Sequence, residues 1–157
     1  MILVSIKPYY YYLIAEEKKK IEVRKTALKN LPQDIAFYMS KDEKSFAKIP
    51  KEFQEKYRKY FGKIGIRVVC DEVKEFHEWE LSPQGKFADF ERERLENFLT
   101  AACLSEEEVV RYRENLPYFK PLYGWHISDL KIYDKPLLLS ELGVTRPPQS
   151  YIFVEEV

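Results

Sequence analysis

Residues that could bind a polar or anionic ligand are concentrated near the start of the chain. Three charged residues lie close together in the sequence, namely Lys19, Glu22 and Arg24. Lys7 lies before them, separated from Lys19 by a short segment. Glu22 and Arg24 are two positions apart, so their side chains share one face if this segment is a strand. An arginine at that distance keeps a carboxylate ionised and oriented. This spacing predicts a charged site on rigid backbone elements.

A second group of chemically versatile residues lies in the aromatic segment from position 123 to 136. In a strand His126 would share a face with Gly124 and Ser128, whose small side chains would leave the imidazole ring accessible. A histidine in such a place can transfer protons near neutral pH. A lone histidine in an aromatic strand is also commonly a hydrogen-bonded structural residue, and both interpretations stay open.

These two groups provide the candidate site residues. The candidates for catalysis are Lys19, Glu22 and His126. The candidate ligand-binding residues combine cations, an acid, aromatic rings and one hydroxyl: Lys7, Tyr10, Lys19, Glu22, Arg24, Lys25, Trp125, His126 and Ser128. Cys70 and Cys103 have no second cysteine or histidine at metal-ligand spacing, which predicts buried thiols, no metal site and no cofactor.

Alternating apolar residues predict the strands that would position these groups. The predicted strands are 2–7, 21–24, 35–39, 62–73, 122–136 and 151–154. Within 122–136 the apolar positions change parity, which predicts a bulge or bend near Ser128 and Asp129. A loop is expected at 76–84.

Helices are predicted after Pro8, in the segment 40–62 after Pro50, and twice between positions 86 and 116. Ser105 and Glu108 form a capping box that opens the last of these helices. The four consecutive tyrosines from Tyr9 to Tyr12 cannot all face one core. Some of their hydroxyls should therefore reach water or line a cleft, where a tyrosine ring can stack on a base.

The charge distribution is uneven although the net charge is zero. Residues 1–67 hold 16 Lys and Arg against 8 Asp and Glu, whereas residues 68–157 hold 10 against 18. This asymmetry indicates either a basic surface for phosphate or pairing between the two halves of one fold. For the basic helical segment 40–62 we favour a solvated outer face over a nucleic-acid contact.

With 157 residues, of which 45% are hydrophobic and 33% charged, the composition is typical of one globular domain covering 1–157. The apolar runs are too short to cross a membrane, and the N-terminus does not have the pattern of a signal peptide. We therefore expect a cytoplasmic protein that does not bind membranes.

The charged motif resembles the signature of ASCH domains, small β-barrels of the PUA-like superfamily. The signature is glycine, any residue, lysine, two of any, glutamate, any, arginine; Lys19, Glu22 and Arg24 match it, whereas Glu17 stands at the glycine position. Further blocks resemble ASCH-type proteins of bacterial and phage genomes, namely 62–71, 103–108, 123–136 and 147–151. The resemblance covers nearly the whole chain.

This resemblance implies an α+β fold: a barrel of about five or six strands with helices closing one end and helical insertions at about 42–61 and 86–116. It also implies a cleft between the barrel and the first helix, lined by Lys19, Glu22 and Arg24, with Lys7 near the rim. ASCH domains are thought to bind RNA or modified nucleotides. RNA or nucleotide binding is therefore the leading functional prediction.

Two other classes of function remain as alternatives. One branch of ASCH-like proteins resembles an amidohydrolase that deacetylates acetylcytidine with a threonine nucleophile beside the motif lysine. In this sequence Glu22 stands at the threonine position, and Thr26 lies four residues further along. An acid–base reaction using Glu22 with His126 is a variant of the enzymatic alternative. The other class is a phage-type regulator that docks a host protein through its basic helix and its acidic C-terminal half.

Overall fold

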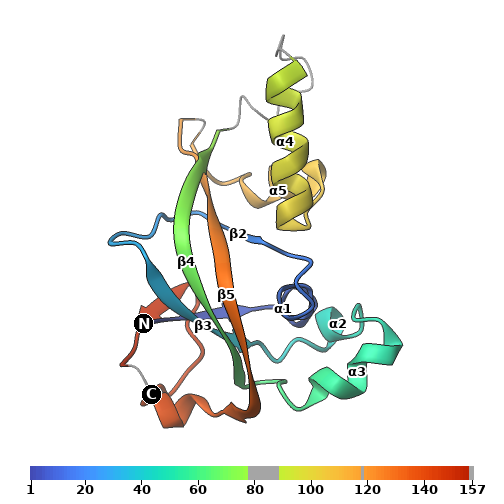
Figure 1. Cartoon of the computed structure of the whole chain (residues 1–157), viewed down its shortest axis with the longest axis vertical. Helices are drawn as coiled ribbons and strands as arrows, with labels where there is room; N and C mark the ends of the chain where they lie inside the picture. Colours follow the sequence, from blue (N-terminus) through green and yellow to red (C-terminus); the bar gives the residue numbers. More distant parts are fainter. Residues whose placement is uncertain (78–88, 118, 156–157) are drawn as a thin grey trace.

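The computed structural model describes residues 1–77, 89–117 and 119–155, and its described strands form one curled sheet (Figure 1). The sheet has six strands in the order β2-β5-β4-β3-β1-β6. The strands are β1 (Ile2–Ile6), β2 (Ile21–Arg24), β3 (Gln33–Met39), β4 (Ile64–Phe76), β5 (Leu122–Leu137) and β6 (Tyr151–Phe153). The sheet curls into a half-barrel, which confirms the predicted α+β class.

Helices cover the two ends of this sheet. They are α1 (Pro8–Ala15), α2 (Glu43–Phe46), α3 (Lys51–Arg58), α4 (Asp89–Ala102) and α5 (Glu106–Tyr112), with a short 3-10 helix at Leu139–Leu142. Figure 1 shows α4 and α5 beside one end of the long β4–β5 ribbon and α2 and α3 near the other end. Each helix predicted from the sequence is present, and none of the described helices is long and apolar enough to cross a membrane.

Strand β1 is buried and fixes the start of the charged site. It pairs in parallel with β3 and antiparallel with β6, and Ile2, Leu3 and Val4 have no exposed surface. Pro8 then ends the strand and begins α1, because its fixed φ suits the first turn of a helix. The Ser45 hydroxyl accepts a hydrogen bond of 3.0 Å from the Tyr9 backbone N–H.

The four tyrosines of α1 separate according to their environment. Tyr11 and Tyr12 are buried, whereas Tyr9 and Tyr10 are partly exposed. The ring centres of Tyr11 and Tyr12 lie 6.4 and 5.7 Å from that of Tyr57 in α3. The basic helical segment 42–61 therefore contributes aromatic side chains to the main hydrophobic core.

A second hydrophobic cluster packs α4 and α5 onto the far end of β4 and β5. Its buried residues are Val23, Phe76, Leu95, Phe98, Ala102, Val109 and Leu122. Phe76 and Phe98 stack with ring centres 4.3 Å apart. The capping box of Ser105 and Glu108 is present, as predicted. The predicted loop at 76–84 lies mostly outside the described residues, and Phe76 belongs to β4.

Two of the three register shifts in the β4–β5 pairing lie beside His126 and Ser128. Val69 pairs with Ser128 and Arg67 with Lys131, so β5 has an extra residue in this interval; Asp129 adopts a positive φ of 51°. This finding confirms the predicted bulge. A second shift between Cys70 and Glu72 places the extra residue in β4.

The two cysteines differ in exposure. Cys70 is buried, as predicted, but Cys103 is partly exposed. Cys103 directly follows α4 with a positive φ of 53°, and its thiol donates to the Lys18 carbonyl at 3.2 Å. The expectation of a buried thiol is therefore wrong for Cys103, because the chain turns out of the helix at this residue.

Candidate functional site

A cleft of about 410 Å³ lies where the end of β1, α1, β2 and α5 meet. This volume is within the range of small-molecule binding sites. The lining residues are Ser5, Ile6, Lys7, Tyr10, Lys19, Glu22, Val23, Arg24, Leu104, Glu108, Arg111 and Tyr112. The structure thus brings together five of the predicted ligand-binding side chains, all from the N-terminal motif.

Glu22 and Arg24 form the floor of the cleft. Arg24 Nε lies 3.7 Å from Glu22 Oε1, and the two side chains are 14% and 10% exposed. Arg24 Nη2 donates to the Ser5 carbonyl at 3.0 Å. Glu22 Oε2, Arg24 Nε and Ser5 Oγ are buried without a hydrogen-bond partner. Burying such groups unpaired is unfavourable, so the floor retains unused hydrogen-bonding capacity.

Lys19 is almost completely buried, with 2% of its surface exposed. Its Nζ donates to the carbonyl of Ala102, the last residue of α4, and lies 5.2 Å from the centre of the Tyr10 ring. Burial lowers the pKa of Lys19, and the nearby Glu22 carboxylate opposes that shift. Lys19 therefore joins the cleft floor to the end of α4.

Helix α5 forms one wall of the cleft, and a hydrogen bond links it to α1. The Tyr10 hydroxyl donates to Glu108 Oε2 at 3.0 Å, and the Ser105 backbone N–H donates to Glu108 Oε1 at 3.1 Å. Burial raises the pKa of Glu108, but hydrogen bonds from Ser105 and Tyr10 outweigh it and the net pKa is lowered. Burial and Glu108 raise the pKa of Tyr10, so its hydroxyl stays a donor.

Sequence reasoning missed the contribution of α5 to this site. Glu108, Arg111 and Tyr112 all line the cleft from this helix. Their spacing of three and four residues places them on one helical face, and the capping box had already fixed where that helix starts. Lys25 lies beside the cleft, with its Nζ 4.8 Å from the centre of the Tyr112 ring.

The residues predicted from β5 do not line this cleft. Trp125 is fully buried, its indole N–H donates to the Thr26 carbonyl at 3.0 Å, and its ring centre lies 5.9 Å from Arg24 Cζ. The Trp125 ring therefore lies against the Arg24 guanidinium on the side away from the cleft. A Cβ on Gly124 would lie 2.7 Å from the Phe98 ring, so this glycine makes room for α4. The His126 side chain is nevertheless 43% exposed, so its predicted accessibility is confirmed although Phe98 fills the space beside Gly124.

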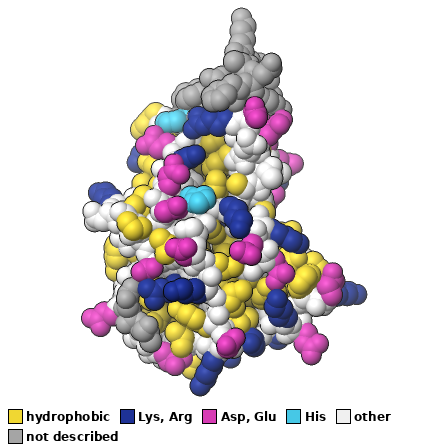
Figure 2. Space-filling view, in the orientation of Figure 1, with side chains coloured by type: hydrophobic (Ala, Val, Ile, Leu, Met, Phe, Trp, Pro, Cys, Tyr) yellow, Lys and Arg dark blue, Asp and Glu magenta, His cyan; other side chains and the backbone are white. Residues whose placement is uncertain are grey.

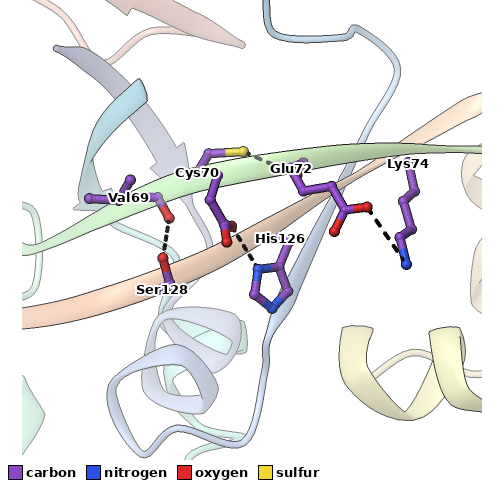
Figure 3. A network of polar contacts seen from close by, with 7 residues as sticks. Val69, Cys70, Glu72, Lys74, His126 and Ser128 are labelled. Carbon is purple, nitrogen blue, oxygen red and sulfur yellow. Dashed lines mark hydrogen bonds and ion pairs between the residues drawn. The ribbon is translucent and has the colours of Figure 1, made fainter. Parts of the chain in front are cut away.

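Figure 3 shows the surroundings of His126 and Ser128 on the β4–β5 ribbon. His126 Nδ1 lies 2.7 Å from Asp71 Oδ1, and the Ser128 hydroxyl donates to the Val69 carbonyl at 3.3 Å. The hydrogen bond with His126 lowers the pKa of Asp71. In the β2–β5 pairing His126 lies opposite Ile21, and Glu22 lies opposite Trp125. Glu22 and His126 therefore project from opposite faces of the sheet and are not brought together.

Three basic residues of the segment around α3 contact groups of the same chain. Lys56 Nζ lies 3.2 Å from Glu16, Arg58 lies 3.0 Å from Glu43, and Lys59 Nζ donates to the backbone carbonyl of residue 134 at 2.9 Å. Figure 2 shows basic and acidic side chains interspersed over the visible face. These contacts support the predicted solvated outer face. Among the described residues, no cluster of three or more His, Cys, Asp or Glu side chains could hold a metal ion.

Comparison with known proteins identifies the fold. No family model and no curated protein matches the sequence. The structure is similar to that of an ASCH protein from Zymomonas mobilis, with a TM-score of 0.64 and 16% identity, covering 99% of this chain and 87% of that chain. A variant of that protein with one tyrosine changed to phenylalanine gives a TM-score of 0.66, 16% identity, and 99% and 90% coverage. The chain therefore has the fold of these ASCH proteins, as the sequence motif predicted.

Proposed function

We propose that the protein binds nucleotides, free or as part of RNA, in the cleft between the half-barrel and helices α1 and α5. The observation that carries this proposal is the combination of exposed cations with an unsatisfied polar floor. Lys7 and Arg111 line the cleft with exposed side chains, and Arg111 also contacts Glu107 at 3.2 Å. Glu22 and Arg24 have buried atoms without hydrogen-bond partners. Cations of this kind bind phosphate, and polar groups below them can recognise a base.

Aromatic side chains make the cleft suitable for a planar ligand. Tyr10 and Tyr112 line it from α1 and α5, and stacking on such rings is a general way to bind bases. The ASCH fold adds support, because the resemblance to ASCH domains had already predicted RNA or nucleotide binding. We also propose a cytoplasmic location, which was the expectation from the sequence.

The test measures binding of fluorescent single-stranded RNA, and of competing nucleoside monophosphates, at low ionic strength. We expect binding that weakens with added salt because phosphate contacts release counterions. The double variant Lys7→Ala with Arg111→Ala should bind about tenfold more weakly. Lys51→Ala, which changes an exposed lysine on α3, is the matched control and should bind normally. If neither RNA nor any nucleotide binds the folded wild-type protein, the proposal is wrong.

The two alternatives from the sequence receive less support from the geometry. The amidohydrolase needs a threonine beside Lys19, but Glu22 takes that position and Thr26 is not among the residues that line the cleft. For docking of a protein partner through the basic helix, the structure offers no hollow with unsatisfied polar groups like the cleft floor among the described contacts of Lys56, Arg58 and Lys59, which reach groups of the same chain. We therefore propose binding, without a reaction, as the function.

A further inference from the structure

We infer that the cleft floor recognises the Watson–Crick edge of guanine. This inference rests on the proposed nucleotide binding and names the base that the site prefers. The relevant groups are the Glu22 carboxylate and the Arg24 guanidinium, which lie side by side on the strand that carries the charged motif.

The hydrogen-bonding capacity left at the floor has a definite pattern. Glu22 Oε2 has no partner, and Glu22 Oε1 has only the ion pair to Arg24 Nε at 3.7 Å, which is too long for a hydrogen bond. Arg24 Nε also has no hydrogen-bond partner. The unused capacity at the floor therefore comprises two acceptors on the carboxylate and, beside them, one donor on the guanidinium.

Guanine is the common base whose edge complements this pattern. Its N2 amino group and N1–H are adjacent donors, and O6 beside them is an acceptor. Adenine and cytosine each present one amino donor next to an acceptor, and uracil places its single N–H between two carbonyl oxygens. A carboxylate facing those bases would meet at least one acceptor, and the repulsion would oppose binding.

The surrounding structure holds both side chains in place for this role. Arg24 is held by the Ser5 carbonyl at 3.0 Å and backed by the Trp125 ring. Glu22 and Arg24 keep 10% and 14% of their side-chain surface exposed and line the cleft. The unpartnered atoms themselves are covered, but the terminal torsion of a carboxylate is soft, so a small rotation presents Glu22 Oε2 to a ligand.

The cations are placed so that a nucleotide would be bound at two points. Lys7 and Arg111 line the same cleft with exposed side chains, from the end of β1 and from α5. If the guanine base of a nucleotide is bound at Glu22 and Arg24, its phosphate would point toward these more exposed cations. Bidentate pairing of a base with a carboxylate discriminates strongly between bases, because the wrong base leaves a buried charge unpaired.

The first test compares inosine and guanosine monophosphates on the wild-type protein by isothermal titration calorimetry. The two nucleotides differ only in the N2 amino group, so loss of one hydrogen bond to a charged acceptor should weaken binding about tenfold or more. Adenosine, cytidine and uridine monophosphates should bind more weakly still. Equal affinity for guanosine and inosine monophosphates would overturn the inference while leaving nucleotide binding intact.

The second test uses Glu22→Gln, which keeps the shape of the side chain and removes one acceptor. The variant should lose the preference for guanosine over inosine monophosphate, and circular dichroism verifies its fold. Glu55→Gln, on the exposed surface of α3, is the control and should keep the preference. A Glu22→Gln protein that still discriminates by tenfold contradicts the inference. Absence of binding to every nucleotide and to RNA by the wild-type protein overturns both the inference and the proposed function.

Discussion

The β1–α1–β2 region and the α2–α3 region are both rich in lysine and aromatic residues, yet the fold uses them in opposite ways. In α2–α3, Lys56 and Arg58 pair with acids of the same chain, and Tyr57 is buried in the main core. Around the cleft, Glu22 and Arg24 keep atoms that have no hydrogen-bond partner.

This difference shows that composition alone does not identify a binding surface. The exposed ion pairs of α3 contribute little to stability, and this region is held in the fold mainly by buried side chains such as Tyr57. Charges that are held rigidly but incompletely paired cost stability, and such groups are commonly found at functional sites. The comparison predicts that changes in α2–α3 affect mainly folding, whereas changes in the cleft affect mainly binding.

The largest expected effect is on stability, from Tyr57→Ala in α3. Tyr57 has no exposed surface, contacts the rings of Tyr11 and Tyr12, and donates a hydrogen bond to Glu16. Truncating a buried aromatic residue should lower the free energy of unfolding by about 3 to 5 kcal/mol. Urea denaturation measures this loss, and Phe53→Ala, at a partly exposed site, should lose less. A loss below about 1 kcal/mol would show that α3 is not part of the core.

The next effect is a pH-dependent loss of stability in Glu16→Gln. Hydrogen bonds from Tyr57 and Lys56 hold the pKa of Glu16 below its ordinary value, so the folded state favours the ionised form. The variant should lose about 1 to 2 kcal/mol at neutral pH. Because this pKa is lowered, the contribution is complete above the ordinary carboxyl range and is lost as the pH falls through the folded-state pKa. Unfolding curves of both proteins from pH 7 to 3 should therefore converge; a constant difference would contradict this account.

A contrasting result is expected for the stability of Glu22→Gln. One oxygen of Glu22 is buried without a partner, so neutralising the side chain relieves an unfavourable charge while weakening the contact with Arg24. The free energy of unfolding should stay within about 1 kcal/mol of wild type. Thermal denaturation of Glu22→Gln beside Glu16→Gln tests this directly. If Glu22→Gln is the less stable of the two, Glu22 has a structural role that the comparison does not assign to it.

The smallest expected effect on the fold comes from Lys7→Ala. Lys7 is exposed at the end of β1, so the variant should unfold within about 0.5 kcal/mol of wild type. RNA affinity should fall. The slope of log affinity against log salt concentration should also become shallower, by the amount that corresponds to about one phosphate contact. An unchanged salt dependence would exclude Lys7 from the phosphate site.

Much of the fold was predictable because local patterns agree with the tertiary structure. Alternation of apolar residues located the strands, Pro8 marked the start of α1, and the change of parity at Ser128 and Asp129 located a bulge. The charged motif also located the cleft floor. Local periodicity could not show which helix would form the opposite wall, because α5 reaches the cleft only through long-range packing on β2, β4 and β5.

The sequence by itself determined that Lys19, Glu22 and Arg24 share one short rigid segment. It also determined that a strand with alternating faces carries Trp125 and His126, since side-chain direction follows from strand geometry. Only the tertiary structure decided that Lys19 donates a hydrogen bond to the Ala102 carbonyl at the end of α4. It also decided that Glu22 and Arg24 keep atoms without a hydrogen-bond partner. The physical reason is that a hydrogen bond depends on groups brought together from distant parts of the chain, which no local pattern specifies.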